Sequence, residues 1–175
     1  MAGEVGIVTI TLFGRPNAES PTKCVVARTR SYKLVEHLIR QWHSTLPNAP
    51  PGFRVAFVVY APNLAPVAVA MWGRPVARME DYEHTLELTR LAHGPGAPYN
   101  LGSWALARMR EWIRENMPEI TRLISYQDAD IHDGAIYKAD NWRRVYEKHT
   151  EHTWTNRPGR KGTERKHKIK WEMEL

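Results

Sequence analysis

The chain has 175 residues and 42% hydrophobic content, enough for one domain with a sizeable core, which argues against a protein that is disordered throughout. Its single cysteine, Cys24, excludes an internal disulfide and favours a reducing compartment. No apolar run reaches membrane-spanning length, and the N-terminus lacks the pattern of a secretory signal, so we expect a single cytoplasmic domain over residues 1–175 with no membrane partner.

The net charge of +6 is concentrated near the C-terminus. Between Arg157 and Lys170, seven Lys and Arg residues stand against one Glu, so this segment holds the whole excess. With Trp154 before it and Trp171 after it, such a segment can neutralise phosphates and stack on bases. The alternative is a solvated tail that only keeps the protein soluble. We favour nucleic acid as the partner, because the entire excess lies in one place.

The first third of the chain contains two strand patterns and one helix pattern. Residues 5–12 alternate like a strand, and residues 24–27 fit another short one. Apolar side chains then recur at helical spacing over residues 32–42. This helix should end near His43, because Pro47 and two further prolines follow and cannot continue it.

A buried hairpin is predicted next. Residues 53–60 and 66–72 are β-rich and almost continuously apolar, so they should form the centre of the sheet. The loop at 73–78 carries Arg74 and Arg78, either of which can hold a phosphate through paired hydrogen bonds. The alternative for each is a surface arginine without a partner.

The middle of the chain reads as a strand followed by a helix. After a solvated link at 79–84, residues 85–91 alternate as in a half-buried strand. The Gly/Pro turn at 93–99 ends it. Asn100 stands where a helix N-cap belongs, and apolar side chains recur at helical spacing from Leu101 to Ile113.

A second strand and a polar loop complete this unit. Residues 120–126 form an apolar strand, which the intervening helix should place parallel to the first. Residues 127–134 are too polar to continue it, and 134–142 fit a short helix or turn. Such a unit places ligand groups at the carboxyl ends of its strands. Residues 168–175 alternate again and predict a C-terminal strand.

Several of these segments resemble the Mom-type phage DNA-modification proteins, which belong to the Gcn5-related N-acetyltransferase (GNAT) superfamily. The resemblance spans roughly residues 35–145 and implies an α/β (α+β) fold with a mixed, mostly antiparallel central sheet flanked by helices. It is carried by Trp42-His43-Ser44, Gly73-Arg-Pro-Val-Ala-Arg78, Leu86-Glu-Leu-Thr-Arg-Leu91, Asn100-Leu-Gly-Ser103, Ser125-Tyr-Gln-Asp128, Gly134-Ala-Ile-Tyr137 and Asn141-Trp142.

The resemblance implies a transferase that adds a small acyl-derived group to the exocyclic amine of adenine in DNA. A phage or mobile element would use it against restriction, in the cytoplasm of a bacterial host. The target base would have to leave the duplex to be reached. The expected phosphate contacts are Arg74, Arg78, Arg90, Arg157, Arg160, Lys161 and Lys166.

The expected catalytic residues lie mostly after the second strand. The resemblance implies that Asp128 is a base or metal ligand, that Tyr137 is an acid, and that Ser125 lies beside them. It also implies that His43 contacts the substrate or a divalent metal such as iron. A carboxylate can take a proton from an amine, and a tyrosine can reprotonate a thiolate. The alternatives are that Asp128 caps the next helix, Tyr137 packs in the core, and His43 caps a helix with its charge on the macrodipole.

The expected co-substrate is acetyl-CoA or a related acyl-CoA. In the superfamily, free amides at a helix N-terminus bind the pyrophosphate of the coenzyme. The usual Gln or Arg with spaced glycines is absent before this helix, so a different donor stays open, and Gly94 to Tyr99 can be a simple connector. The residues implied in binding are Leu91, Asn100, Leu101, Gly102, Ser103 and Asn141.

Two other functions remain open. One is an acetyl-CoA-dependent N-acetyltransferase of a small amine, peptide or aminoacyl group, with a tail unrelated to catalysis. The other is a non-catalytic nucleic-acid-binding module that keeps the fold and has lost the reaction. The second predicts DNA binding with a steep salt dependence and no product.

Overall fold

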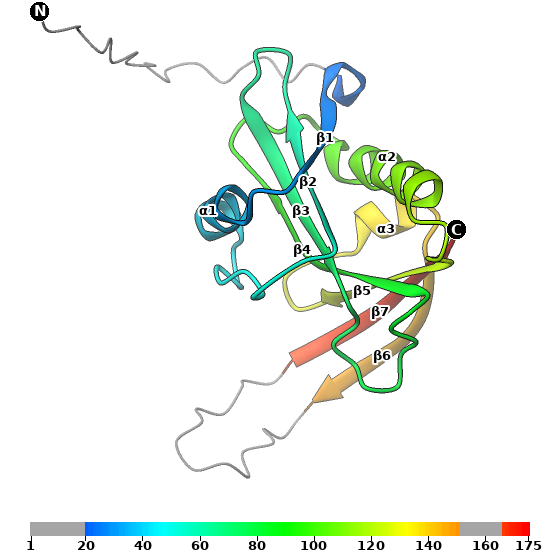
Figure 1. Cartoon of the computed structure of the whole chain (residues 1–175). Helices are drawn as coiled ribbons and strands as arrows, with labels where there is room; N and C mark the ends of the chain where they lie inside the picture. The colour runs from blue at the N-terminus through cyan, green and yellow to red at the C-terminus, as the bar shows by residue number, and fades with distance from the viewer. Residues whose placement is uncertain (1–19, 151–165) are drawn as a thin grey trace, which may run out of the picture.

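A computed structural model describes residues 20–150 and 166–175, in which seven strands form one sheet with helices on both faces (Figure 1). The strand order is β1-β2-β3-β4-β5-β7-β6, and only the β4–β5 pair is parallel. The predicted mixed, mostly antiparallel sheet is confirmed. The elements are η1 (Pro21–Lys23), β1 (Val25–Thr29), α1 (Tyr32–Trp42), β2 (Val55–Tyr60), β3 (Pro66–Gly73), β4 (Thr85–His93), α2 (Leu101–Asn116), β5 (Arg122–Asp128), α3 (Ala135–Ala139), β6 (Arg143–Thr150) and β7 (Lys166–Glu174).

The helices divide the core between the two faces of the sheet. In β2, Phe57 packs with residues of α2, whereas Ala56 and Val58 on either side pack with residues of α1. Successive strand residues point to opposite faces, so a strand covered on both faces must be apolar throughout. This explains the continuous apolar runs of the central hairpin.

A β-bulge bends β4 in the middle. Met71 pairs with Arg90 and Trp72 with Leu88, which leaves Thr89 as an extra residue in β4. The Thr89 hydroxyl donates to the carbonyl of Met71 at 3.1 Å and closes the bulge. Bulges redirect the following side chains and often lie next to functional sites.

Beyond this bulge, β4 and β5 separate. Their parallel pairing runs from Thr85 with Arg122 to Leu88 with Ser125 and then stops. However, β4 continues to His93 and β5 to Asp128, and β5 stays paired with β7 through Asp128. The two strands therefore leave a wedge between their carboxyl ends. The turn that leads from β4 to α2 begins at the same end of the sheet.

Most element predictions in the described residues are confirmed. The helix at 32–42, the central hairpin and the parallel strand pair all form. Asn100 does occupy the N-cap of α2, but it has φ 62 and makes no side-chain cap hydrogen bond. The predicted strand at 5–12 lies outside the described residues. Among the described helices, none is long and apolar enough to cross a membrane.

Two predictions for the C-terminal strand are wrong. Trp171 is only 3% exposed and stacks on Tyr137, so it cannot stack on bases. Lys170 is 5% exposed, and its ammonium lies 2.5 Å from Glu80 and 2.6 Å from Glu172. Its charge therefore stabilises the fold instead of facing phosphate.

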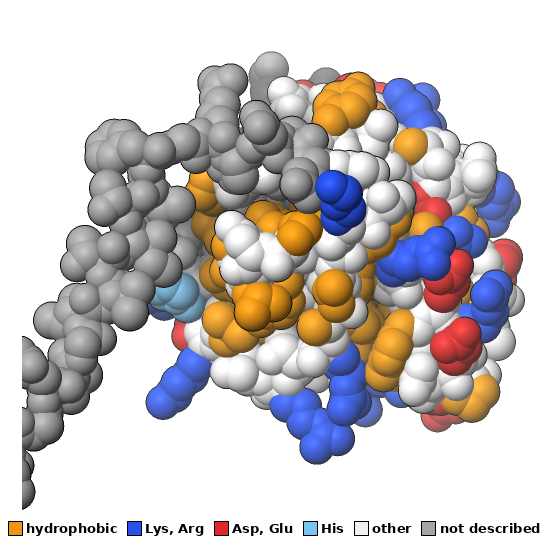
Figure 2. All heavy atoms as spheres, turned by 90° about the horizontal axis from the view of Figure 1, so that it is seen from above, with side chains coloured by type: hydrophobic (Ala, Val, Ile, Leu, Met, Phe, Trp, Pro, Cys, Tyr) orange, Lys and Arg blue, Asp and Glu red, His pale blue; other side chains and the backbone are white. Residues whose placement is uncertain are grey.

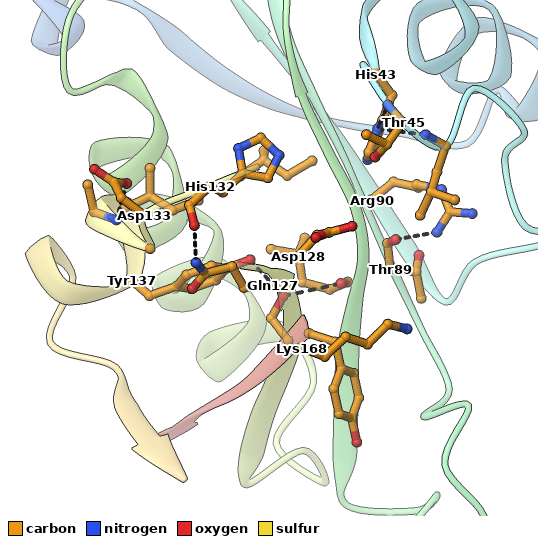
Figure 3. Close-up of a pocket in the computed structure, with 18 of the residues that line it drawn as sticks. His43, Thr45, Thr89, Arg90, Gln127, Asp128, His132, Asp133, Tyr137 and Lys168 are labelled. Atoms are coloured by element: carbon orange, nitrogen blue, oxygen red, sulfur yellow. Dashed lines mark hydrogen bonds between the residues drawn. The ribbon is translucent and has the colours of Figure 1, made fainter. Parts of the chain in front are cut away.

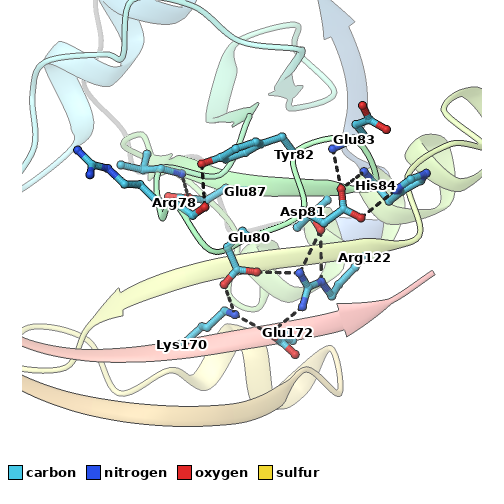
Figure 4. Close-up of polar contacts among 12 residues, drawn as sticks. Arg78, Glu80, Asp81, Tyr82, Glu83, His84, Glu87, Arg122, Lys170 and Glu172 are labelled. Atoms are coloured by element: carbon cyan, nitrogen blue, oxygen red, sulfur yellow. Dashed lines mark hydrogen bonds and ion pairs between the residues drawn. The ribbon is translucent and has the colours of Figure 1, made fainter.

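The connection between β3 and β4 is also more than a solvated link. Glu80 pairs with Arg122 at 2.7 Å as well as with Lys170, and Arg122 reaches Glu172 at 3.4 Å (Figure 4). We call Glu80, Arg122, Lys170 and Glu172 the ion cluster. It fastens this connection to β5 and β7.

Candidate functional site

A cavity of about 270 Å³ opens in the wedge between β4 and β5 (Figure 3). This volume is close to the lower end of small-molecule pockets, about 300–1,000 Å³. The lining residues come from the end of α1, from β4, β5 and β7, from α3 and from the loop that leads to α3. They include His43, Arg90, Ser125, Asp128, His132 and Tyr137.

Strand alternation puts two different chemistries on the two sides of this pocket. Ser125 and Gln127 point to the face that carries α2 and α3, whereas Asp128 points to the face that carries α1. Lys168, paired with Asp128 across β5 and β7, lies at the pocket edge. The pocket therefore connects a hydroxyl-lined side with a charged side.

Tyr137 and Ser125 form the hydroxyl pair. Their oxygens lie 2.8 Å apart, and Tyr137 stacks on Trp171 with ring centroids 5.3 Å apart. Burial raises the pKa of Tyr137, although its hydrogen bond to Ser125 opposes the rise. Tyr137 thus packs in the core, as the alternative held, and also presents a protonated hydroxyl to the pocket.

Asp128 does not cap the next helix. Its carboxylate accepts from the amide of Asp130 at 3.3 Å, and Gly134 occupies the N-cap of α3. Asp133 accepts from the amide of Ala135 at 2.9 Å and supports the start of that helix instead. The carboxylate of Asp128 is therefore available to a ligand.

Gln127 is a site residue that the sequence did not indicate. Its amide donates to the carbonyl of His132, and its oxygen accepts from the Trp171 indole at 2.7 Å. Gly134 has φ 73, and a Cβ there would lie 2.5 Å from the Gln127 oxygen. Gln127 thus holds the loop that carries His132. The prediction that residue 127 is too polar to continue the strand is wrong, because β5 extends to Asp128. The available signal was the alternation that puts Gln127 on the same face as Ser125.

His43 is the C-cap of α1, but not in the expected way. Its Nδ1 accepts from the amides of Thr45 at 3.4 Å and Leu46 at 3.2 Å. Burial, the charge of Arg90 and nearby His132 together lower the pKa of His43. The alternative of a helix cap is therefore confirmed in position, while the lowered pKa disfavours the charged ring that the helix macrodipole would favour.

The residues present do not fit a metal ion held by His43. A metal needs a nitrogen lone pair, and the Nδ1 lone pair of His43 is already used by two backbone amides. In the described ranges, no group of three or more His, Cys, Asp or Glu side chains is arranged to hold a metal. His93 also lines the pocket, and burial, followed by the effect of His132, lowers its pKa.

Arg90 holds the chain after α1 in place. Its guanidinium donates to the carbonyls of Thr89 at 2.6 Å and Asn48 at 3.0 Å. Its Nε is buried and has no partner among the described residues. Arg90 therefore ties the segment that follows His43 to β4, and its expected phosphate contact stays a prediction.

The expected cofactor residues fall into two groups. Leu91 lines the pocket, whereas Asn141 follows α3 with φ 59 and is not part of the lining. Asn100, Leu101, Gly102 and Ser103 form the start of α2, directly after the turn that ends β4. At Gly102, a Cβ would lie 2.6 Å from Ile136, so this first turn packs closely against α3.

The candidate nucleic-acid residues are only partly described. Arg74 and Arg78 are exposed on the β3–β4 connection, at the lower end of Figure 1. Figure 2 looks onto the opposite end, where hydrophobic side chains gather with Lys and Arg side chains around them. Lys166 begins β7. Arg157, Arg160, Lys161 and Trp154 lie outside the described residues.

Comparison with solved structures shows the fold. Spermidine N-acetyltransferase from Vibrio cholerae, in complex with CoA and spermine, is 6% identical with a TM-score of 0.61, over 87% of this chain and 96% of that one. The ribosomal-protein-S18-alanine N-acetyltransferase from Escherichia coli is 14% identical with a TM-score of 0.57, over 87% of this chain and 94% of that one. These similarities establish a GNAT-like fold.

Sequence comparison identifies the family. No curated protein matches the chain. The model of the Mom protein family, however, matches residues 23–174, which include the seven described strands, the helices α1 to α3 and the whole lining of the pocket. The chain therefore belongs to the Mom protein family.

Proposed function

We propose that this protein is an acyltransferase that modifies DNA by adding a small acyl-derived group to the exocyclic amine of adenine. The observation that carries the proposal is the pocket in the wedge, with the Asp128 carboxylate on one side and the Tyr137–Ser125 hydroxyl pair on the other. Family membership supports DNA as the substrate, and a phage or mobile element would use the product against restriction.

The start of α2 fits the diphosphate of an acyl-CoA. Asn100 makes no side-chain cap bond, and in the described chain the amides of Gly102 and Ser103 have no acceptor. Free amides at a helix N-terminus bind anions. The spermidine N-acetyltransferase from Vibrio cholerae, which has a similar fold, was solved in complex with CoA. When bound, the coenzyme supplies the acyl group as an activated thioester.

Asp128 would act as the general base and Tyr137 as the general acid. The Asp128 carboxylate would accept a proton from the amine as the new C–N bond forms. The Tyr137 hydroxyl stays protonated at neutral pH, since burial raises its pKa, and it would give a proton to the thiolate that leaves when the C–S bond of the thioester breaks. Ser125 would orient this hydroxyl through their 2.8 Å hydrogen bond.

DNA would meet the charged side of the pocket. Lys168 is exposed at the pocket edge, and Arg74 and Arg78 are exposed on the β3–β4 connection. Together with the basic segment of residues 157–170, these side chains would contact phosphates. The adenine would be turned out of the duplex to reach the pocket.

The test is mass spectrometry of nucleosides from plasmid DNA in cells that express the protein. We expect a heavier deoxyadenosine, reduced roughly 100-fold or more by Asp128→Asn. Asp130→Asn is the matched control, because Asp130 lies on the same turn but is exposed and outside the pocket lining. Unmodified DNA from cells with folded wild-type protein would contradict the proposal.

A small-amine N-acetyltransferase is the second candidate. Asp128 and Asp133 both line the pocket and would suit an ammonium group. This candidate predicts acetyl transfer from acetyl-CoA to amines such as spermidine, with no modified nucleoside. A non-catalytic DNA-binding module predicts neither product, and salt-sensitive DNA binding alone would favour it.

A further inference from the structure

The ring of His43 is held in one tautomer by the backbone. Its Nδ1 accepts from the amides of Thr45 and Leu46, at 3.4 Å and 3.2 Å. A neutral imidazole has one acceptor nitrogen and one N–H, so a ring that accepts at Nδ1 carries its proton at Nε2. The free nitrogen of His43 is therefore a hydrogen-bond donor.

We propose that the Nε2–H of His43 binds a ring nitrogen of the acceptor base while Asp128 accepts from the adjacent exocyclic amine. The proposal rests on the proposed function and names the chemistry by which its site recognises the amine-bearing edge of a base. Both residues line the pocket, and in Figure 3 the Asp128 carboxylate is directed toward the β4 side, where His43 and Arg90 lie.

A donor beside an acceptor selects a particular edge of a base. Adenine presents an exocyclic amine beside a ring-nitrogen acceptor and matches both groups. Guanine presents two acceptors on its major-groove edge and does not match there, but the N2 amine of guanine beside N3 and the N4 amine of cytosine beside N3 carry the same pair as adenine. An alkylammonium offers only donors, and His43 would have nothing to bind. This arrangement therefore favours a heteroaromatic amine over the polyamines of the second candidate.

The surroundings of His43 keep this donor neutral. Burial, Arg90 and His132 lower its pKa, which disfavours the imidazolium. Arg90 also ties the segment after His43 to β4 through the carbonyl of Asn48. A neutral imidazole with a depressed pKa is a known electrophile in enzyme sites.

Two variants separate the backbone contact of His43 from its proposed substrate contact. In His43→Asn, the side-chain oxygen can replace Nδ1 as acceptor for the two amides, but the distant N–H is lost. In His43→Gln, the amide nitrogen can replace the Nε2 donor, but the acceptor near the backbone is lost. If His43 only shaped the turn, Asn would retain activity and Gln would not.

The first experiment measures the tautomer and needs no substrate. The full-length protein is labelled with ¹⁵N-histidine, and His43 is assigned by its absence from the His43→Asn spectrum. We expect a protonated Nε2 and an unprotonated Nδ1 at neutral pH, unchanged by added Mn²⁺. An Nδ1–H tautomer, or selective broadening of His43 by Mn²⁺, would overturn the proposal.

The second experiment measures coupling between His43 and the base. Duplexes carry deoxyadenosine, 7-deazadeoxyadenosine or 1-deazadeoxyadenosine as the target. Wild-type modification should fall roughly 10- to 100-fold on the analogue that lacks the bound nitrogen. The His43→Asn protein should modify deoxyadenosine more slowly than the wild type by a similar factor, and it should lose no further activity on that analogue. The His43→Gln protein should keep part of the activity that His43→Asn loses.

The outcomes distinguish this inference from the function on which it rests. If deoxyadenosine is modified and the analogue reduces the rate by the same factor in the wild type and in His43→Asn, the proposed role of His43 is wrong. The proposed transferase function would still stand. A wild-type protein that modifies none of the three duplexes, when supplied with its acyl donor, would overturn the proposed function and the inference together.

Discussion

Lys168 and Lys170 lie two residues apart on the same face of β7, yet they serve two different regions. Lys168 is exposed at the edge of the pocket, next to the end of β5. Lys170 is 5% exposed and contacts both carboxylates of the ion cluster. One strand therefore supplies a charge to the candidate site and a charge to the fold.

The two regions differ in how their charges are balanced. In the ion cluster, two cations and two carboxylates pair with one another at 2.5 to 3.4 Å. In the pocket, the Asp128 carboxylate accepts only from the amide of Asp130 among the described residues. A buried charge is costly without a partner, whereas a binding site needs one that is free for its ligand. Loss of a charge should therefore cost stability in the cluster and activity in the pocket.

Lys170→Met should have the largest effect on stability. It leaves Arg122 as the one cation of the ion cluster beside the two carboxylates of Glu80 and Glu172, so one buried negative charge is no longer balanced within the cluster. Removal of one member of a buried ion pair typically costs about 3–5 kcal/mol. Chemical denaturation monitored by tryptophan fluorescence would measure the loss.

Lys168→Met is the matched control for this change. An exposed lysine away from such a cluster should alter the free energy of unfolding by less than about 0.5 kcal/mol. Under the proposed function, it should weaken DNA binding and flatten its salt dependence. Equal destabilisation by the two variants would contradict the division between the two regions.

Gly134→Ala should have the next largest effect, and it acts on the pocket. The new Cβ would lie 2.5 Å from the Gln127 oxygen and 2.8 Å from the Trp171 ring, at a residue with φ 73. Because Gln127 is held by two hydrogen bonds, it cannot move without releasing the loop of His132. We expect the free energy of unfolding to fall by about 2 kcal/mol. Modification activity should fall by more than this loss of stability alone would cause.

Gly52→Ala is the control for glycine replacement. No atom lies within 4 Å of the position that its Cβ would take. Its stability should stay the same or rise by roughly 0.5 kcal/mol, because alanine restricts the unfolded chain. A Gly134→Ala protein as stable and active as Gly52→Ala would show that Gln127 does not hold the pocket wall.

The local pattern was sufficient to predict the elements around the site. Periodicity and the prolines after His43 defined α1, and the strand, helix and strand between Thr85 and Tyr126 defined the parallel pair. The wedge depends on the extra residue Thr89, and nothing local in the alternation of β4 marks where the bulge falls.

Long-range pairings explain what was missed. Glu80 and Lys170 are 90 residues apart, and Trp171 and Gln127 are 44 apart, so neither contact has a local signal. Composition alone suggested that Lys170 and Trp171 belonged to a basic, base-stacking segment. The alternation of β7 already indicated that Trp171 is buried, because it puts Trp171 on the core face with Ile169 and Lys170 on the opposite face.

The smallest effect is expected from pH, and it separates the two regions by their acid sensitivity. In the pocket, burial first, then Arg90 and His132, lower the pKa of His43 below 6.5. The unfolded chain therefore takes up this proton first as pH falls, and stability decreases from about pH 6.5 downward. In the ion cluster, burial opposes ionisation of Glu172, but Lys170, Arg122 and Arg143 together lower its pKa below 4.5.

The contribution of Glu172 should therefore be complete above pH 4.5 and decrease as pH falls through its folded pKa. The difference in the free energy of unfolding between the wild type and His43→Asn should change below about pH 6.5. The difference between the wild type and Glu172→Gln should change only below about pH 4.5. Taking differences cancels groups of opposite sign, such as Glu87, whose pKa burial raises. If both differences changed over the same pH range, the pocket and the ion cluster would titrate as one network instead of two regions that share a strand.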